Sequence, residues 1–174
     1  SGVHNLHRNV IFRDNGDRAR QVEPFTVYPP QGSDNPVDLW KWMAGYEDKT
    51  GGNVLAIAHN GNLSNGIMFP LVEAFGKRLD RGYVQDRQKW ERLYEGTQTK
   101  GDGEAHPFLS PNDEFADFET WDKDNLDGSV AKKKEMLKFE YARSAYKNGL
   151  LLEQKCGTNP YNFGLVGSSD AHTG

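Results

Sequence analysis

The sequence predicts an α/β fold, and three features of its pattern support this class. Residues 54–58 form a nearly continuous apolar run, which is typical of a strand covered on both faces in a parallel sheet. A helical pattern precedes this run, and a polar loop rich in glycine and asparagine follows it. A second apolar strand, residues 164–167, also leads into a polar loop. This order is typical of βα units, in which chemistry lies outside the carboxyl ends of the strands.

The first part of the chain contains a short strand, a loop and a helix. Residues 10–12 are β-branched and aromatic, which predicts a strand. Prolines and a glycine interrupt residues 14–36, so we expect a loop there. A helix then begins at Asn35-Pro36, because asparagine caps helix N-termini and proline is favoured at the first helical position. We expect this helix to end at Gly51-Gly52.

The rest of the chain contains two further helices, another short strand and a long irregular segment. A charged helical pattern over residues 81–92 leads into a strand at residues 93–98. Residues 99–128 are rich in Gly, Asp, Asn and Pro, which indicates a loop; loops of this length are usually functional or disordered. The clearest helical periodicity covers Ser129 to Asn148, with Ser129 as its cap and Gly149 as its stop.

Composition excludes several classes of function. The chain has 174 residues, which is the length of one domain. Its formal net charge is -4 and its lysines and arginines are scattered, so we expect no nucleic-acid partner. A single cysteine, Cys156, rules out an intramolecular disulfide framework and is expected to be structural. No apolar stretch approaches the roughly 20 residues of a membrane span, so we expect no membrane partner. The lone cysteine and the lack of a secretion signal favour a cytoplasmic location.

Histidines and carboxylates follow the predicted strands. His59 comes directly after the first buried strand, Glu95 lies in the strand at residues 93–98, and Asp170 and His172 follow the last strand. Because the carboxyl ends of parallel strands meet at one edge of a sheet, we expect these side chains to converge. A carboxylate beside imidazole suits Zn, Mn or Fe better than Ca. The alternatives are a Ser/Asp-rich turn with an incidental histidine and a hydrogen-bonded structural histidine.

Two loops carry further candidates. Glu104 and His106 lie two residues apart on a glycine-rich backbone and could serve in proton transfer or substrate contact; a flexible acidic turn is the alternative. Asn60, Asn62 and Asn65 could donate hydrogen bonds to a phosphoryl or carboxyl oxygen, although loop capping is the commoner role of such residues.

The segment from residue 110 to residue 122 is acidic and aromatic. Its carboxylates do not have the spacing of a twelve-residue calcium loop, because the glycine at the sixth position is missing. We expect Phe115, Phe118 and Trp121 to be buried anchors of this segment and the acids to be solvated or to cap turns.

Four segments carry a resemblance to a known family: HRNVIFR at residues 7–13, AIAHNGNLSNG at 56–66, GDGEAHP at 101–107 with the residues up to Glu119, and GSSDAHTG at 167–174. These segments resemble domain-of-unknown-function family 3604, which is similar to the PHP superfamily, named for polymerase and histidinol phosphatase. That resemblance implies a distorted βα barrel with metal ions at its C-terminal mouth. The expected fold is therefore α/β, a partial PHP-like distorted βα barrel with long irregular loops.

The resemblance also assigns roles to residues. His59 resembles the histidine at a strand end of the superfamily, Glu95 resembles its strand-end glutamate, and Asp170 and His172 resemble its terminal Ser-Asp-Ala-His motif. These four are the expected metal ligands, whereas no superfamily role transfers to the loop of Glu104 and His106. The N-terminal His-x-His and the Thr-Asp-His motifs of the superfamily do not appear, and the histidines of residues 4–7 have the wrong spacing. We therefore expect residues 1–174 to be one incomplete PHP-like domain.

These observations predict a fragment of a metal-dependent hydrolase acting on a small-molecule substrate, with phosphoesters as the first expectation. The cofactor would be a divalent metal ion, Zn, Mn or Fe, which the isolated chain would bind weakly or not at all. Exposed barrel edges would favour self-association. One alternative is a non-catalytic binding or structural domain with the same scaffold. Another is that the acidic loop at residues 101–122 is a protein-interaction surface.

Overall fold

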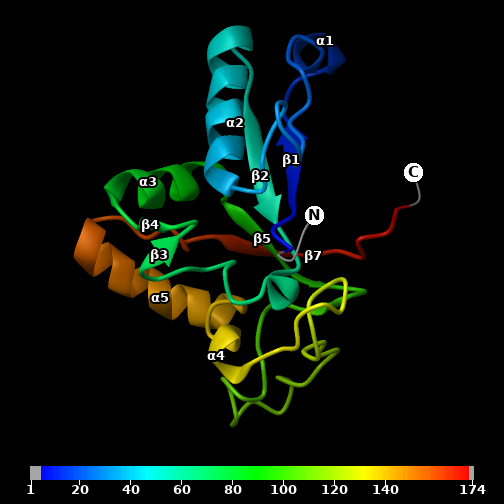
Figure 1. Ribbon diagram of the computed structural model, residues 1–174, viewed down its shortest axis with the longest axis vertical. Helices are drawn as coiled ribbons and strands as arrows, with labels where there is room; N and C mark the ends of the chain where they lie inside the picture. Colours follow the sequence, from blue (N-terminus) through cyan, green and yellow to red (C-terminus); the bar gives the residue numbers. More distant parts are fainter. Residues whose placement is uncertain (1–4, 173–174) are drawn as a thin grey trace.

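An open sheet of five strands organises the protein in the computed structural model, which describes residues 5–172 (Figure 1). Strand β5 lies at its centre. It pairs in parallel with β2 and β7 and antiparallel with the short β6, while β1 pairs antiparallel with β2. The five strands are β1 (Arg8–Phe12), β2 (Val54–Ala58), β5 (Leu93–Gln98), β6 (Gly101–Asp102) and β7 (Gly164–Gly167).

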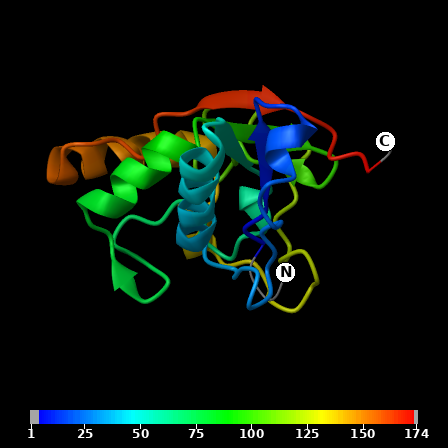
Figure 2. The ribbon, with the colours of Figure 1, turned by 90° about the horizontal axis from the view of Figure 1, so that it is seen from above.

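The remaining elements surround this sheet. A separate two-stranded hairpin pairs β3 (Glu73–Ala74) with β4 (Lys77–Arg78). Both ribbon views place α3 and α5 on one side of the molecule, whereas the chain after β7 leaves on the opposite side (Figure 1 and Figure 2). No helix of residues 5–172 is long and apolar enough to cross a membrane. The helices are α1 (Gly16–Ala19), α2 (Pro36–Thr50), α3 (Arg81–Trp90), α4 (Lys134–Leu137) and α5 (Ala142–Cys156), with a 3-10 turn, η1 (Gly61–Leu63).

The predicted start and end of the helix at residue 36 are confirmed. Asn35 Oδ1 accepts a hydrogen bond from the Val37 backbone N–H at 3.0 Å, and Pro36 occupies the first helical position. Gly51 ends the helix in the left-handed conformation, with φ of 64°. These signals depend on neighbouring residues alone, which is why the sequence predicts them well.

A buried ionic network joins β1, α2 and α3. Glu91 follows α3 and is 3% exposed. Its carboxylate accepts hydrogen bonds from Arg8 Nε at 2.9 Å and from Trp40 Nε1 at 3.0 Å, and it lies 3.1 Å from the guanidinium nitrogen Nη2 of Arg87. Burial alone would raise the pKa of Glu91, but the charges of Arg8 and Arg87 outweigh it and lower that pKa. The network therefore fixes β1, α2 and α3 relative to one another.

Two apolar clusters form the core. The first packs α2 against β2 and includes Trp40, Met43 and Ala56. The second packs α5 against β2 and β5, and the centroid of the Phe69 ring lies 5.0 Å from that of the Tyr94 ring. The two clusters therefore cover β2 and β5, the strands beside His59 and Glu95.

The expected βα barrel is wrong, because the sheet stays open. Only β2, β5 and β7 run parallel, and among residues 5–172 the strand β1 pairs with β2 alone. A barrel requires continuous pairing around a closed ring of tilted strands. The protein is instead a small mixed α/β structure.

The expected helix from Ser129 to Asn148 is also wrong in its bounds. Ser129 lies in a turn, where its backbone N–H donates to Asp127 Oδ1, and the helical part is divided between α4 and α5. Helix α5 continues through Gly149 and ends at Gly157, whose φ is 77°. A Cβ atom on Gly149 would lie 2.1 Å from Asn159 Oδ1. Gly149 therefore serves a close tertiary contact rather than a helix end.

Two loops differ from expectation as well. The loop at residues 14–36 contains the short helix α1. In the second loop, the aromatic side chains expected to be anchors are exposed: Phe115 by 74%, Phe118 by 62% and Trp121 by 46%. The buried apolar side chains there are Ala105 and Ala116, which are small enough to pack close to the backbone. The aromatic character of these three residues therefore did not identify the buried positions of the loop.

Candidate functional site

The carboxyl ends of three parallel strands gather candidate residues, as the sequence predicts. Ile57 in β2 pairs with Leu93 in β5, and Glu95 in β5 pairs with Val166 in β7. This register places His59 beside Glu95: the distance from His59 Nδ1 to Glu95 Oε2 is 3.6 Å, and both side chains are buried. The pairing of β5 with β7 has a bulge between Glu95 and Thr97, a common feature next to functional sites.

Asn60 and Gln98 connect His59 to the last strand. The carbonyl oxygen of Asn60 can only accept, so His59 Nδ1, at 3.1 Å, donates to it and the lone pair of His59 is left on Nε2. The amide nitrogen of Gln98 donates to Asn60 Oδ1 at 2.6 Å and to Asp170 Oδ2 at 3.0 Å. Asn60 has φ of 53°, a left-handed conformation that asparagine tolerates better than most residues. It turns the chain sharply after β2.

Asp170 is the most heavily engaged carboxylate of the site. Its Oδ2 atom forms an ion pair with Lys100 Nζ and accepts from Gln98, and its Oδ1 atom lies 3.2 Å from His172 Nε2. Hydrogen bonding from Lys100, helped by that from His172, lowers the pKa of Asp170 to about 2. Asp170 is therefore ionised at neutral pH, whereas the side chain of His172 is 85% exposed at the margin of the site.

Sequence reasoning missed three members of this site, His7, Gln98 and Lys100. The rings of His7 and His59 have centroids 5.7 Å apart, and the backbone N–H of His59 donates to the carbonyl of His7. The pairing of β1 with β2 causes this contact, and no local sequence signal gives the register of that pairing. We call the set His7, His59, Asn60, Glu95, Gln98, Lys100, Asp170 and His172 the strand-end cluster.

Burial controls the charge state of the inner part of the strand-end cluster. Burial lowers the pKa of His59 and that of His7, so both imidazoles favour the neutral form that binds metal ions. Burial raises the pKa of Glu95. Its Oε2 atom is buried and accepts no hydrogen bond from any described residue, which is costly for a carboxylate oxygen.

The donor types in the strand-end cluster are those that divalent metal ions prefer, but their arrangement is not that of a metal site. Imidazole nitrogens and carboxylate oxygens suit Zn, Mn and Fe, and the unpartnered oxygen of Glu95 needs a cation or a donor. However, in the described part of the chain no group of three or more His, Cys, Asp or Glu side chains is arranged to hold an ion. The donors lie in one neighbourhood, with Asp170 occupied by other partners.

Glu104 and His106 lie outside the strand-end cluster and contact other residues. Glu104 pairs with Arg143 at 2.9 Å. His106 Nε2 lies 3.0 Å from Asp122 Oδ2, and its Nδ1 accepts from the backbone N–H of Phe108 at 3.1 Å. Both ring nitrogens of His106 are thus engaged in fixing the long loop, which leaves no free lone pair for proton transfer.

The predicted asparagines divide between two roles. Asn60 belongs to the strand-end cluster, as described. Asn62 is 1% exposed, and its amide donates to the carbonyls of Lys100 and Trp121, so it ties the turn after β5 to the long loop. Asn65 has φ of 57° and forms part of the turn after η1. The structure brings only Asn60 into contact with the candidate ligands.

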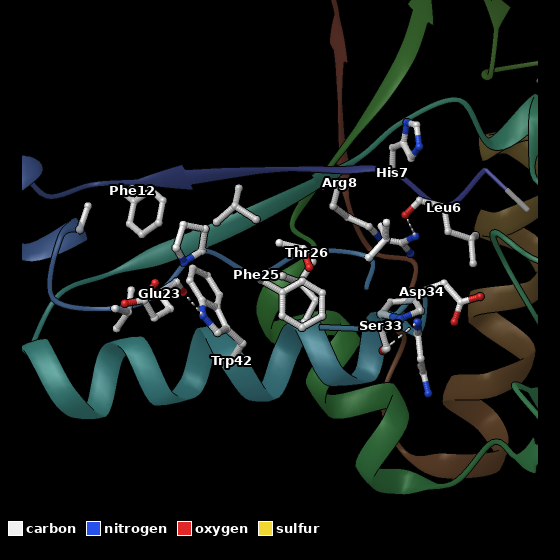
Figure 3. A pocket seen from close by; sticks show the side chains of 18 of the residues that line it. Leu6, His7, Arg8, Phe12, Glu23, Phe25, Thr26, Ser33, Asp34 and Trp42 are labelled. Atoms are coloured by element: carbon white, nitrogen blue, oxygen red, sulfur yellow. Dashed lines mark hydrogen bonds between the residues drawn. The ribbon is translucent and has the colours of Figure 1, made fainter. Parts of the chain in front are cut away.

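A separate groove of about 730 Å³ runs along β1. It lies between β1, the loop at residues 16–36 and α2, and its walls are mainly apolar, with Val10, Leu39 and Trp42 among the lining residues. Figure 3 shows Arg8 and Phe12 on the groove side of β1 and the ring of His7 on the other side. His7, a member of the strand-end cluster, is also among the residues that line the groove, so the two sites meet at this end of β1.

Comparison with known proteins gives one finding. A family model described as "Protein of unknown function (DUF3604)" matches residues 1–174. No curated protein and no solved structure matches the chain. The family part of the predicted resemblance is therefore confirmed, while nothing in these comparisons links the chain to the PHP superfamily.

Proposed function

The chain belongs to the DUF3604 family over its whole length, and from this premise we propose that it carries the site of a divalent-metal-dependent hydrolase. The observation that carries the proposal is the proximity of buried His59 and Glu95, 3.6 Å apart, at the ends of neighbouring parallel strands. Asp170 reaches the same place from β7 and is linked to His59 through Gln98 and Asn60.

In this proposal His59, Glu95 and Asp170 hold the ion, with His172 as a ligand from the margin. When bound, a divalent cation polarises a phosphoryl oxygen and makes water a better nucleophile near neutral pH. Asn60 fixes the proton of His59 on Nδ1, so that Nε2 keeps its lone pair. Gln98 orients the carboxylate of Asp170. Glu104 and His106 are assigned to holding the loop rather than to proton transfer.

We propose a phosphoester as the substrate class. The support is the Lys100 ammonium and the Gln98 amide, two donors within the strand-end cluster that suit anionic oxygens. The resemblance of residues 169–172 to the terminal Ser-Asp-Ala-His motif of the PHP superfamily also supports this proposal. The PHP-like barrel is not part of the proposal.

Metal content tests the proposal directly. Purified protein, incubated with Zn²⁺ or Mn²⁺ and then desalted, is expected to keep the metal in stoichiometric amount, measured by plasma mass spectrometry. His59→Ala and Asp170→Ala are expected to lose it. Glu104→Ala is the matched control, since it removes a carboxylate outside the strand-end cluster. Metal-free wild-type protein would contradict the proposal.

The groove along β1 favours a second candidate, a non-catalytic binding domain for an apolar ligand. Its volume of about 730 Å³ falls in the range of small-molecule sites, which are mostly apolar. An apolar fluorescent probe such as ANS is expected to bind wild-type protein and to bind less to Val10→Asp, with the fold checked by circular dichroism. Equal binding to both proteins would remove the support for this candidate.

A further inference from the structure

We propose that β1 binds an extended peptide segment of a partner protein, which joins the sheet as a further strand. Alternate apolar side chains of that segment enter the groove along β1, and its basic residues reach the carboxylates at the rim. This inference rests on the second candidate function, a binding site in the groove, and names the ligand of that site. It is independent of the proposed metal site.

The outer edge of β1 is free to pair. Of the strands that the structure describes, β1 pairs only with β2. The backbone N–H of His59 donates to the carbonyl of His7, so these two residues form a hydrogen-bonded pair. Such pairs recur at every second residue of an antiparallel ladder. The backbone groups of Arg8, Val10 and Phe12 therefore point away from β2, where a further strand can bind them.

The free edge and the groove lie together. The side chains of Arg8, Val10 and Phe12 line the groove, and Figure 3 shows Arg8 and Phe12 on the groove side of β1. Residues directly opposite each other on neighbouring strands carry their side chains on the same face of the sheet. A strand bound at this edge therefore places every second side chain in the groove. Its other wall includes Leu39 and Trp42 of α2, so those side chains are expected to be apolar.

The loop that closes the groove is fixed to α2 at two points. Trp42 Nε1 donates to the carbonyl of Glu23 at 2.9 Å. The hydroxyl of Ser33 donates to Asp38 Oδ2 at 2.8 Å and accepts from the backbone N–H of Asn35 at 3.2 Å. The groove is therefore formed without a ligand, which lowers the entropic cost of binding.

The charges at the rim of the groove select a basic ligand. Its two lining arginines, Arg8 and Arg20, are each paired with a carboxylate. The lining residues Glu23 and Asp34 are exposed, and neither forms an ion pair in the described part of the chain. Figure 3 places them toward opposite ends of the groove. Unpaired negative charge at both ends complements a segment with basic residues on either side of an apolar stretch.

Two other occupants fit these observations less well. A small apolar molecule would fill the groove but leave the edge of β1 and the rim carboxylates without partners. A second copy of this chain, paired antiparallel through its own β1, would bring the carboxylate at one end of its groove against the carboxylate at the other end. Like charges in such positions repel. A basic peptide strand uses the edge, the apolar walls and the rim together.

The probe for charge is the heptapeptide Lys-Thr-Val-Thr-Val-Thr-Lys, whose lysines and valines share one face when it is extended. Labelled with a neutral fluorophore, it is expected to bind wild-type protein saturably in fluorescence anisotropy. The same peptide with glutamate in place of both lysines is expected to bind at least tenfold more weakly. Glu23→Gln combined with Asp34→Asn should remove most of that difference, whereas Glu114→Gln, an exposed carboxylate of the long loop, should leave it unchanged.

N-methylation of the peptide tests strand pairing on wild-type protein. Methylation of both valine nitrogens and methylation of two threonine nitrogens remove the same number of donors, but only one of these sets faces β1 in a bound strand. We expect one methylated peptide to bind at least tenfold more weakly than the other. Equal affinities of the two would overturn strand addition.

Val10→Pro tests the edge from the side of the protein. The N–H of Val10 points away from β2, so proline at this position keeps the ladder between β1 and β2 and removes a donor from the free edge. The affinity for the lysine peptide is expected to fall at least tenfold, while ANS still binds the groove. Circular dichroism checks the fold. An unchanged peptide affinity would overturn the inference.

The outcomes separate this inference from the second candidate function. If ANS binds wild-type protein and the lysine peptide does not, peptide binding is overturned and the site for an apolar ligand stands. If neither binds, both fall. Wild-type dimers in analytical ultracentrifugation that dissociate in Val10→Pro would overturn the inference in favour of a second copy on β1.

Discussion

Replacing Glu91 by alanine is expected to cause a large loss of stability. The carboxylate is 3% exposed and is shared by Arg8 and Arg87, whose side chains are 2% exposed. Glu91→Ala leaves two buried guanidinium groups without their shared anion. Removing one partner of a buried ion pair typically costs about 3–5 kcal/mol.

The structure adds reasons to expect the upper part of that range. Trp40 Nε1 also loses its acceptor, at 3.0 Å, and an unsatisfied buried donor costs about 1–3 kcal/mol. Arg87 keeps its bond to the carbonyl of Met68 and its position over the ring of Tyr161, which limits the loss. We therefore expect the free energy of unfolding to fall by about 4–5 kcal/mol, which is a large share of the typical total.

Urea unfolding followed by tryptophan fluorescence and circular dichroism measures this loss. Glu91→Gln, which keeps the shape and one acceptor, is expected to lose less than Glu91→Ala. Arg20→Ala is the control, because it removes an ion pair with Asp17 that is exposed on both sides, and it is expected to leave stability unchanged. A loss for Glu91→Ala below about 1 kcal/mol would refute the reasoning, since the desolvated charges would then have found other partners.

Three further predictions concern stability. Burial raises the pKa of Asp102 to about 6, above its unfolded value, so the folded state favours the protonated form. The free energy of unfolding is therefore expected to fall by about 3 kcal/mol as the pH rises from about 4 past 6. Urea unfolding at each pH measures this dependence, and Asp102→Asn is expected to remove it. Gly149→Ala is expected to lower the melting temperature despite the better helix propensity of alanine, and Asn159→Ala in the same chain should restore it. Phe115→Ser is expected to change the free energy of unfolding by less than about 0.5 kcal/mol, and a large loss would restore its interpretation as an anchor.

The parts of the fold that sequence predicted are those set by neighbouring residues. The cap of α2 at Asn35 and the left-handed Gly51 at its end need no tertiary partner. The apolar runs of β2 and β7 likewise identify themselves as strands. At Gly149 the same local reasoning failed, because a glycine can serve a close contact with Asn159 instead of a helix end.

The candidate site likewise contains residues that the sequence could predict and residues that it could not. His59 and Asp170 could be predicted, because His59 directly follows β2, Asp170 comes three residues after β7, and parallel strands end at one edge. His7 could not, because its contact with His59 depends on the antiparallel register of β1 with β2. Lys100 could not either, since its place at Asp170 depends on the turn between β5 and β6.

The sequence by itself determined α2, β2, β5 and β7, the start of α3, and the chemistry of the donors, because these follow from side-chain pattern and local hydrogen bonding. Only the tertiary structure decided that the sheet stays open, that the aromatic residues of the long loop face solvent, and that a lysine stands among the carboxylates. Those features depend on strand pairing between distant segments, and no local pattern encodes the register of that pairing.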